Sequence, residues 1–340
     1  INVSIAPQDD DRLVIDGIKI GIAAAGIRYQ DRNDLVIFEL CETSTTAATF
    51  TRNRFAAAPV HVAKTHLTQS HPRYLLINAG NANAGTGEQG MNDARESCRY
   101  LAAKSDLSTS AVLPFSTGVI GEYLPMNKLQ AGIDIALGNI SKHHWEDAAN
   151  AIMTTDTQAK FVRLQFTLNG KVCNIVGIAK GSGMIHPDMA TMLAFLATDA
   201  GITQHDLQNA LQQAVEDSFN CITVDGDTST NDACIAIATG QGELSISDDP
   251  MEQEVFTAKL TEACKQLAEM IIRDAEGATK FARIRVLGGR NRQECKSIGY
   301  TVALSPLVKT ALFGQDPNWG RILAAVGRAP VAVSYTHLTL

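Results

Sequence analysis

The chain has 340 residues, of which 45% are hydrophobic and 19% charged, and its formal net charge is −7. This length and composition allow a large hydrophobic core and argue against global disorder. No block of lysines and arginines stands out, which argues against nucleic acid or an anionic membrane as a main partner. No apolar run approaches the roughly 18 residues of a transmembrane helix, and residues 9–11 are acidic where a signal peptide would be basic.

The seven cysteines are scattered and form no C-x-x-C motif. This pattern favours reduced, buried thiols in a cytoplasmic protein over a disulfide framework or a zinc site. The chain starts at Ile1, and residues 334–340 read like a translated cloning or adapter tail. We therefore expect this tail to be non-native and the natural chain to continue beyond it.

Short apolar strands and amphipathic helices follow one another along the chain. Strand patterns cover residues 35–41, 73–78, 110–115, 233–238 and 281–287, and a hairpin turning at Asn169-Gly170 covers residues 161–179. Helical spacing covers residues 89–105, 145–153, 204–219 and 251–274, and Thr203 is the expected N-cap of the third helix. Hairpins interrupted by helices favour an α+β protein with two sheets between helices over a doubly wound parallel sheet.

The segment from Lys180 to Phe195 carries the strongest chemical signal. In it a glycine-rich turn precedes Ala190, Thr191 and an apolar run. The glycines permit backbone angles that other residues resist, and the apolar run would anchor Thr191 on a buried element. Attack of the Thr191 hydroxyl on the Ala190 carbonyl would cut the chain and leave an α-amine that serves as general base. Taken alone, the Ala-Thr pair also fits an ordinary strand entry.

The whole segment resembles, nearly residue for residue, the cleavage segment of the glutamate N-acetyltransferase (ornithine acetyltransferase) family of arginine biosynthesis. The resemblance extends over residues 12–332 through the segments 26–28, 51–60, 77–84, 220–232, 274–280 and 314–321. It implies an αββα sandwich core over residues 10–276, cleaved between positions 190 and 191. It also implies a smaller α+β C-terminal domain over residues 280–333, which is incomplete because the family's pocket-closing C-terminal polar residues have no counterpart.

Thr117 and Gly118 follow a predicted strand and are candidates for the oxyanion site. A glycine after a strand can point its N–H into a cleft, and the threonine hydroxyl can add a second donor. The alternative is a strand-to-helix turn with Thr117 as N-cap. The family resemblance assigns these two residues to the stabilisation of the tetrahedral intermediate.

Lys180, Thr154 and Glu276 are candidates for substrate binding. Lys180 could hold a substrate carboxylate, although a lone lysine is more often a solvated surface residue. Thr154 could hydrogen-bond the same amino acid, or simply end a helix. Glu276 could pair with a substrate amine; as a helix-end residue it would be disfavoured by the helix dipole. All three positions match substrate contacts of the family.

Two further matching segments are predicted to be structural. Residues 225–232 contain three aspartates, but the spacing of a calcium loop is absent, so capped turns lining a cleft are expected instead of a metal site. Residues 314–321 are expected to form a turn with an aromatic anchor and a buried ion pair.

The resemblance implies an acetyltransferase that moves an acetyl group from N-acetylornithine to glutamate through an acetyl-Thr191 ester. This ping-pong scheme needs no metal or nucleotide cofactor, and acetyl-CoA is a possible second donor. An assembly of two α and two β chains is implied. The alternatives are a self-processing N-terminal-threonine aminopeptidase or amidohydrolase, which passes the acyl group to water, and a binding protein that is never cleaved.

Overall fold

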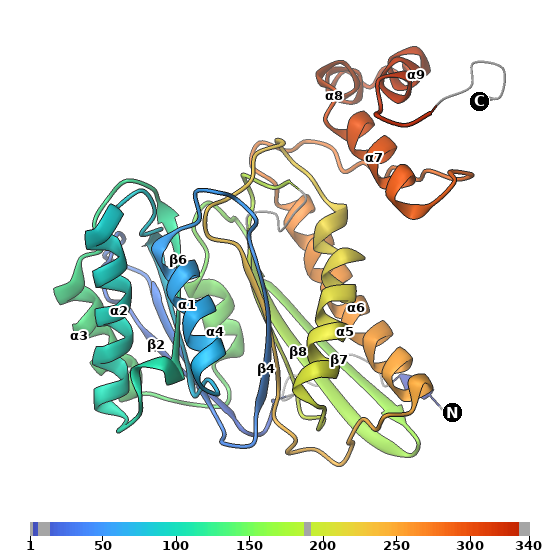
Figure 1. Cartoon of the computed structure of the whole chain (residues 1–340). Helices are drawn as coiled ribbons and strands as arrows, with labels where there is room; N and C mark the ends of the chain where they lie inside the picture. The colour runs from blue at the N-terminus through green and yellow to red at the C-terminus, as the bar shows by residue number, and fades with distance from the viewer. Residues whose placement is uncertain (1–2, 6–13, 187–191, 333–340) are drawn as a thin grey trace.

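Two β-sheets packed face to face form the centre of the molecule (Figure 1). The computed structural model describes residues 3–5, 14–186 and 192–332. In spatial order, the larger sheet consists of β1 (Val3–Ile5), β7 (Lys160–Leu168), β8 (Lys171–Lys180), β9 (Leu193–Thr198), β10 (Ala233–Ala238) and β4 (Thr45–Phe50). The smaller sheet consists of β2 (Ile18–Ala23), β3 (Leu35–Leu40), β5 (Tyr74–Asn81) and β6 (Val112–Val119).

Most neighbouring strands are antiparallel, and β7 and β8 form the predicted hairpin. Its turn residues Asn169 and Gly170 both have positive φ, 52° and 79°, as the tight turns of right-twisted hairpins require. Two pairs, β5–β6 and β9–β10, are parallel. Parallel strands need long crossover connections, and these contain α2 (Gly87–Lys104) and α5 (Gln204–Glu216) respectively.

Alternating side chains on the strands build a core between the sheets and a core outside each sheet. On β9, Leu193 and Phe195 belong to the core between the sheets, whereas Ala194 and Leu196 belong to the core beneath the outer helices. Phe195 stacks on Phe38 of the smaller sheet with the ring centroids 5.6 Å apart. Central strands such as β5, β9 and β10 are therefore buried on both faces, which explains their nearly continuous apolar runs.

Helices cover the outer faces of both sheets (Figure 1). The smaller sheet is covered by α2 and α3 (Met126–Leu137), and the larger sheet by α5 and α6 (Pro250–Arg273). Two further helices, α1 (Ala58–Gln69) and α4 (Trp145–Ala151), contact β6 and β8 respectively. This order of layers confirms the predicted α+β fold and αββα sandwich. Within the described ranges, no helix combines the length and the apolar character needed to cross a membrane.

Beyond the sandwich, the chain forms a small group of helices. They are α7 (Arg292–Ala303), α8 (Pro306–Phe313) and α9 (Trp319–Gly327), which share a core of Val302, Val308 and Ala325. The limits predicted for the two domains, 10–276 and 280–333, stay a prediction. The tail predicted at residues 334–340 lies outside the described residues, which end at residue 332.

Two predictions about the C-terminal part are wrong. Residues 281–287 form no strand; they alternate in sequence, but no described strand pairs with them, and Leu287 is 79% exposed. Trp319 is 61% exposed and is therefore no buried anchor. The Arg321 guanidinium donates to the Leu307 carbonyl and the Thr310 hydroxyl rather than to the expected carboxylate. A sequence pattern indicates a strand or an anchor only where a partner surface covers it.

Candidate active site

The C-terminal end of β6 carries the two predicted oxyanion residues. Gly118 has a φ of +133°, and a Cβ on this residue would overlap the carbonyl carbon of Gly80 in β5. Only glycine therefore allows β5 and β6 to approach this closely. Thr117 is buried beside it. The alternative of Thr117 as an N-cap is wrong, because the next helix, α3, has Pro125 at its N-cap.

The loop before β10 connects this strand end to the larger sheet. The Asn231 side-chain amide donates to the carbonyl oxygens of Ala82 at 2.7 Å and Ser116 at 2.9 Å. The Ser116 hydroxyl donates in turn to the side-chain oxygen of Asn78 at 2.6 Å. A buried carbonyl group without a hydrogen bond destabilises the fold, and these bonds remove that cost. The loop therefore has a structural role, as predicted for residues 225–232, and it clamps the two sheets together.

The neighbouring residue, Asp232, holds the start of β9. Its Oδ1 accepts the Met192 N–H at 3.0 Å, and Oδ2 has no hydrogen-bond partner among the described residues. Burial raises the pKa of Asp232 well above its ordinary value, although the Met192 amide opposes this effect. Ala190 and Thr191, the predicted cleavage pair, lie outside the described residues. Asp232 binds Met192, and the preceding residue, Asn231, binds Ser116 of β6. These two consecutive residues therefore connect the start of β9 to the strand end that carries Thr117.

Lys180 ends β8 directly opposite Leu193 of β9. Its side chain is only 5% exposed, and its Nζ lies 3.9 Å from Oδ2 of Asp156. Burial lowers the pKa of Lys180, and the charge of Asp156 opposes this effect. The alternative of a solvated surface lysine is therefore wrong. The lysine is a buried cation beside the strand that follows the cleavage segment.

Asp156 is the centre of a buried ion-pair network. Its Oδ1 accepts the Gly181 N–H at 2.7 Å and a hydrogen bond from Lys160 Nζ at 2.6 Å. Lys160 Nζ also donates to Oδ2 of Asp274, just after α6, at 2.6 Å. Burial would raise the pKa of Asp156, but the charges of Lys180 and Lys160 outweigh it and lower this pKa below its ordinary value. Each buried charge thus has a partner of opposite sign, as burial demands.

The other two predicted substrate residues lie at the rim of this network. Thr154 follows α4, and its N–H donates to Oδ2 of Asp156 at 3.0 Å. Glu276 follows α6, and a Cβ on Gly183 would come within 2.6 Å of its carboxylate. Thr154, Lys180 and Glu276 therefore converge from three elements, whereas the predicted oxyanion residues belong to the other sheet.

Sequence reasoning missed the residues that hold this arrangement together. Asp156, Lys160 and Asp274 are not among the predicted site residues, and position 274 enters the sequence analysis only as a helix end and as the start of a matching segment. The sequence did carry one signal, because Lys160 begins a strand whose alternate residues are buried. A charged residue at a buried strand position needs a buried partner, but its partner Asp274 is 114 residues away.

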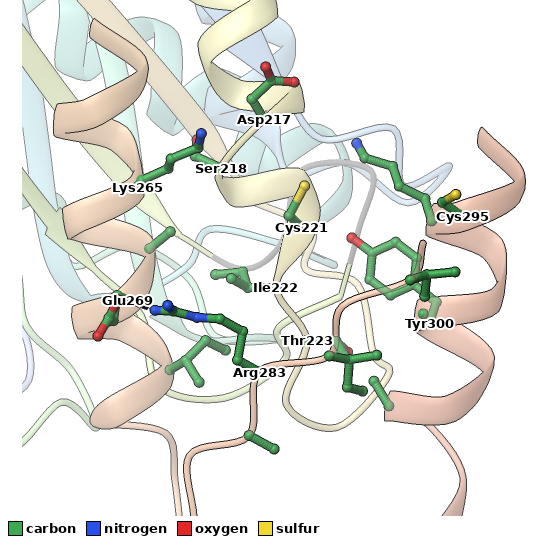
Figure 2. Close-up of a pocket in the computed structure, with 18 of the residues that line it drawn as sticks. Asp217, Ser218, Cys221, Ile222, Thr223, Lys265, Glu269, Arg283, Cys295 and Tyr300 are labelled. Atoms are coloured by element: carbon green, nitrogen blue, oxygen red, sulfur yellow. Dashed lines mark hydrogen bonds and ion pairs between the residues drawn. The ribbon is translucent and has the colours of Figure 1, made fainter. Parts of the chain in front are cut away.

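A separate groove lies between α6 and α7, as Figure 2 shows. Its volume is about 640 Å³, and none of the predicted site residues lines it. Its lining includes Ile222, Thr223, Lys265, Glu269, Arg283 and Tyr300. Arg283 forms an ion pair with Glu269 at 3.0 Å across this groove. The groove is therefore distinct from the candidate active site at the strand ends.

The two sheets and their helical layers define an αββα sandwich. Its candidate active site is the group of buried polar residues at the ends of strands from both sheets. The ArgJ family model matches residues 19–340, and the chain belongs to the ArgJ family. It is 52% identical over 333 residues to the arginine biosynthesis bifunctional protein ArgJ of Methylococcus capsulatus, covering 96% of this chain and 81% of the relative. It is 52% identical over 320 residues to the protein of the same name from Psychrobacter arcticus, covering 93% of this chain and 78% of the relative.

The fold also occurs in a solved structure of low sequence identity. The PH0078 protein from Pyrococcus horikoshii OT3 aligns with a TM-score of 0.50 and 13% identity, covering 80% of this chain and 89% of that protein. The family resemblance predicted from the motifs is confirmed by the family match. The chain is therefore an acetyltransferase of arginine biosynthesis, as predicted, and the aminopeptidase or amidohydrolase alternative is not supported.

Proposed function

We propose that Thr191 is both the site of self-cleavage and the catalytic nucleophile. Its hydroxyl attacks the Ala190 carbonyl, the peptide bond is replaced by an ester, and water releases a chain that begins at Thr191. The new α-amine has a reference pKa of about 7.7–8.0, so a useful fraction is neutral and can accept the hydroxyl proton. The anchoring of Met192 by Asp232 supports this proposal, because it fixes the residue bonded to Thr191.

The oxyanion of each tetrahedral intermediate is stabilised by Thr117 and Gly118. The positive φ of Gly118 and its close approach to β5 give this strand end a backbone conformation that ordinary residues do not adopt. Donors held in place before the reaction stabilise developing charge without the cost of reorganisation. The Asn231 clamp on Ser116, the residue before Thr117, supplies that rigidity.

The substrates are N-acetylornithine and glutamate. The Thr191 hydroxyl attacks the acetyl carbon, the acetamide C–N bond breaks, and the departing ornithine amine takes up the proton. Glutamate then attacks the acetyl-threonine ester through its amine and leaves as N-acetylglutamate, with the Thr191 hydroxyl restored. Both substrates carry an α-carboxylate for Lys180, and Glu276 and Thr154 bind the rest of the amino acid.

The observation that carries this proposal is the convergence of a buried cation, a carboxylate and a hydroxyl residue beside the cleavage segment. Lys180 faces the strand that begins after Thr191, and Glu276 lies over Gly183. An amino-acid zwitterion needs both a cation and an anion in its binding site, and no metal or cofactor is required by the chemistry. Acetyl-CoA can serve as a second acetyl donor.

Two further features belong to the same proposal. The family resemblance implies an assembly of two α and two β chains produced by the cleavage. The scattered, unpaired cysteines support a reducing compartment such as the cytoplasm.

Acceptor dependence tests the proposed reaction. The protein is incubated with N-acetylornithine carrying a labelled acetyl group, with and without glutamate. We expect labelled N-acetylglutamate in the presence of glutamate, and without it only a stoichiometric burst of ornithine as the acetyl-enzyme forms. Continuous release of labelled acetate without glutamate would support the amidohydrolase instead, and the Thr191→Ala variant controls for contaminating activity.

A further inference from the structure

The two buried lysines of the site are paired very differently. Lys160 Nζ donates hydrogen bonds of 2.6 Å to both Asp156 and Asp274. Lys180 Nζ lies 3.9 Å from Asp156, which is beyond hydrogen-bond distance. No described residue accepts a hydrogen bond from Lys180, although its side chain is only 5% exposed. Among the described residues, Lys180 is thus held by charge, and none of them takes up its three N–H donors.

The charges that face Lys180 come from three elements. Asp156 lies in the segment after α4 and attracts the ammonium group, and Asp232 in the loop before β10 attracts it as well. Lys160 on β7 repels it. Asp274, after α6, is paired with Lys160. The carboxylate of Asp156 lies 3.9 Å from the Lys180 ammonium and 2.6 Å from that of Lys160, so it is shared between the two lysines.

Asp156 also fixes the backbone around the predicted substrate residues. Its Oδ2 accepts the Thr154 N–H at 3.0 Å, and its Oδ1 accepts the Gly181 N–H at 2.7 Å. One carboxylate therefore contacts the residue after Lys180 and the backbone of Thr154, and it faces the Lys180 charge. Its side chain is fully shielded from solvent, so substrate cannot contact it in this arrangement.

We propose that Asp156 is a positioning residue for substrate binding, which keeps Lys180 charged and aligned with Thr154 so that the pair receives the carboxylate of the amino-acid substrate. This inference rests on the proposed function, because Asp156 acts by positioning two of the proposed substrate residues. Because Asp156 opposes the effect of burial on Lys180 and Lys160 reinforces it, altering these two residues affects substrate binding in opposite directions.

The test uses two variants with opposite expected effects. Asp156→Asn keeps an oxygen for the Gly181 N–H but removes the charge, so Lys180 loses its proton at lower pH. We expect KM for glutamate to rise about tenfold near pH 8 with kcat changed less than about threefold, and the alkaline rise of KM to begin about one pH unit lower. Lys160→Gln removes a repelling cation, so the same rise begins at higher pH.

The matched control is Asp199→Asn, at the far end of β9. Counted over the whole residue, backbone included, Asp199 and Asp156 are both 8% exposed, and each accepts a backbone N–H. Steady-state KM and kcat are measured from about pH 6 to pH 10 for the wild type and all three variants, with thermal unfolding as a check on folding. The control should keep the wild-type pH profile of KM, because Asp199 does not face Lys180.

If the pH at which KM begins to rise shifts in opposite directions for Asp156→Asn and Lys160→Gln, the proposal is supported. A general loss of packing would shift this pH in the same direction for both variants. A wild-type KM profile for Asp156→Asn, or shifts in the same direction, would overturn it. If Asp156→Asn does not fold, Lys160→Gln decides alone: a shift to higher pH supports the proposal and an unchanged profile refutes it. Failure of the proposed function is a separate result, because the wild type itself would then transfer no acetyl group to glutamate.

Discussion

The ends of β6 and β8, which both contribute to the site, are stabilised by different interactions. The end of β6 contains no charged residue, and its shape comes from the conformation of Gly118 and from hydrogen bonds to backbone carbonyl groups. The end of β8 is shaped by charge, because Lys180 and Lys160 share the carboxylate of Asp156. Added side-chain volume should therefore destabilise the end of β6. The stability of the end of β8 should instead depend on its charges and on pH.

The largest effect is expected at the uncharged end. Gly118→Ala places a methyl group onto the backbone of Gly80, at a φ that only glycine adopts readily. We expect a loss of about 3 kcal/mol or more in the free energy of unfolding, measured by urea denaturation. Gly121→Ala is the control, because its φ is also positive but nothing lies within 4 Å of the added Cβ. An equal cost for the two variants would contradict the close approach of β5 and β6.

The second prediction concerns activity at the same strand end. Thr117→Val keeps the shape of the side chain but removes the proposed oxyanion donor. We expect kcat to fall about 10²–10³-fold, with little change in KM, because the lost interaction forms only in the transition state. Thr117→Ser restores the hydroxyl and should recover most of the rate. If the serine variant is as slow as the valine variant, the hydroxyl is not the donor.

The smallest effect is expected from a single charge at the other end. Burial would raise the pKa of Asp274, but hydrogen bonds from Lys160 and Thr157 outweigh it and lower this pKa below its ordinary value. Asp274 therefore stabilises the fold above the ordinary aspartate pKa of about 3.9, and this contribution is lost as the pH falls through the lower pKa of the folded state. Asp274→Asn should cost about 2 kcal/mol at pH 7.

The same variant gives the pH test for the charged end. The difference in unfolding free energy between wild type and Asp274→Asn should stay nearly constant from pH 7 down to about pH 5 and then shrink as the pH falls below the ordinary aspartate pKa of about 3.9. Asp134→Asn is a useful control, because the Asp134–Lys104 ion pair is 45% exposed on both sides and water screens its charges, so its loss should change the unfolding free energy much less than the loss of Asp274 does. A pH-independent difference for Asp274→Asn would mean that its charge is not what stabilises this end.

Local patterns allowed much of the fold to be predicted from the sequence. The strand at residues 233–238 matches β10, the helix predicted at residues 251–274 matches α6 to within one residue, and Thr203 caps α5 by accepting the Asp206 N–H. These features depend on residues close together in the chain. The strand at residues 281–287 failed because its formation depends on a partner strand.

The site was predictable only in part, for the same reason. Thr154, Lys180 and Glu276 were found because their segments resemble a known family, and the structure places them together. The residues that organise them were missed because each acts over a long sequence separation. Asn231 reaches Ser116 across 115 residues, and Lys160 reaches Asp274 across 114. No local pattern indicates such pairs.

The central claim is that Thr191 cuts the chain and then carries the acetyl group. Intact-mass measurement of the purified, folded protein tests it most directly. We predict two fragments separated between Ala190 and Thr191 for the wild type, and one uncut chain for Thr191→Ala. A single uncut chain from wild-type protein that nevertheless transfers acetyl groups to glutamate would contradict the account.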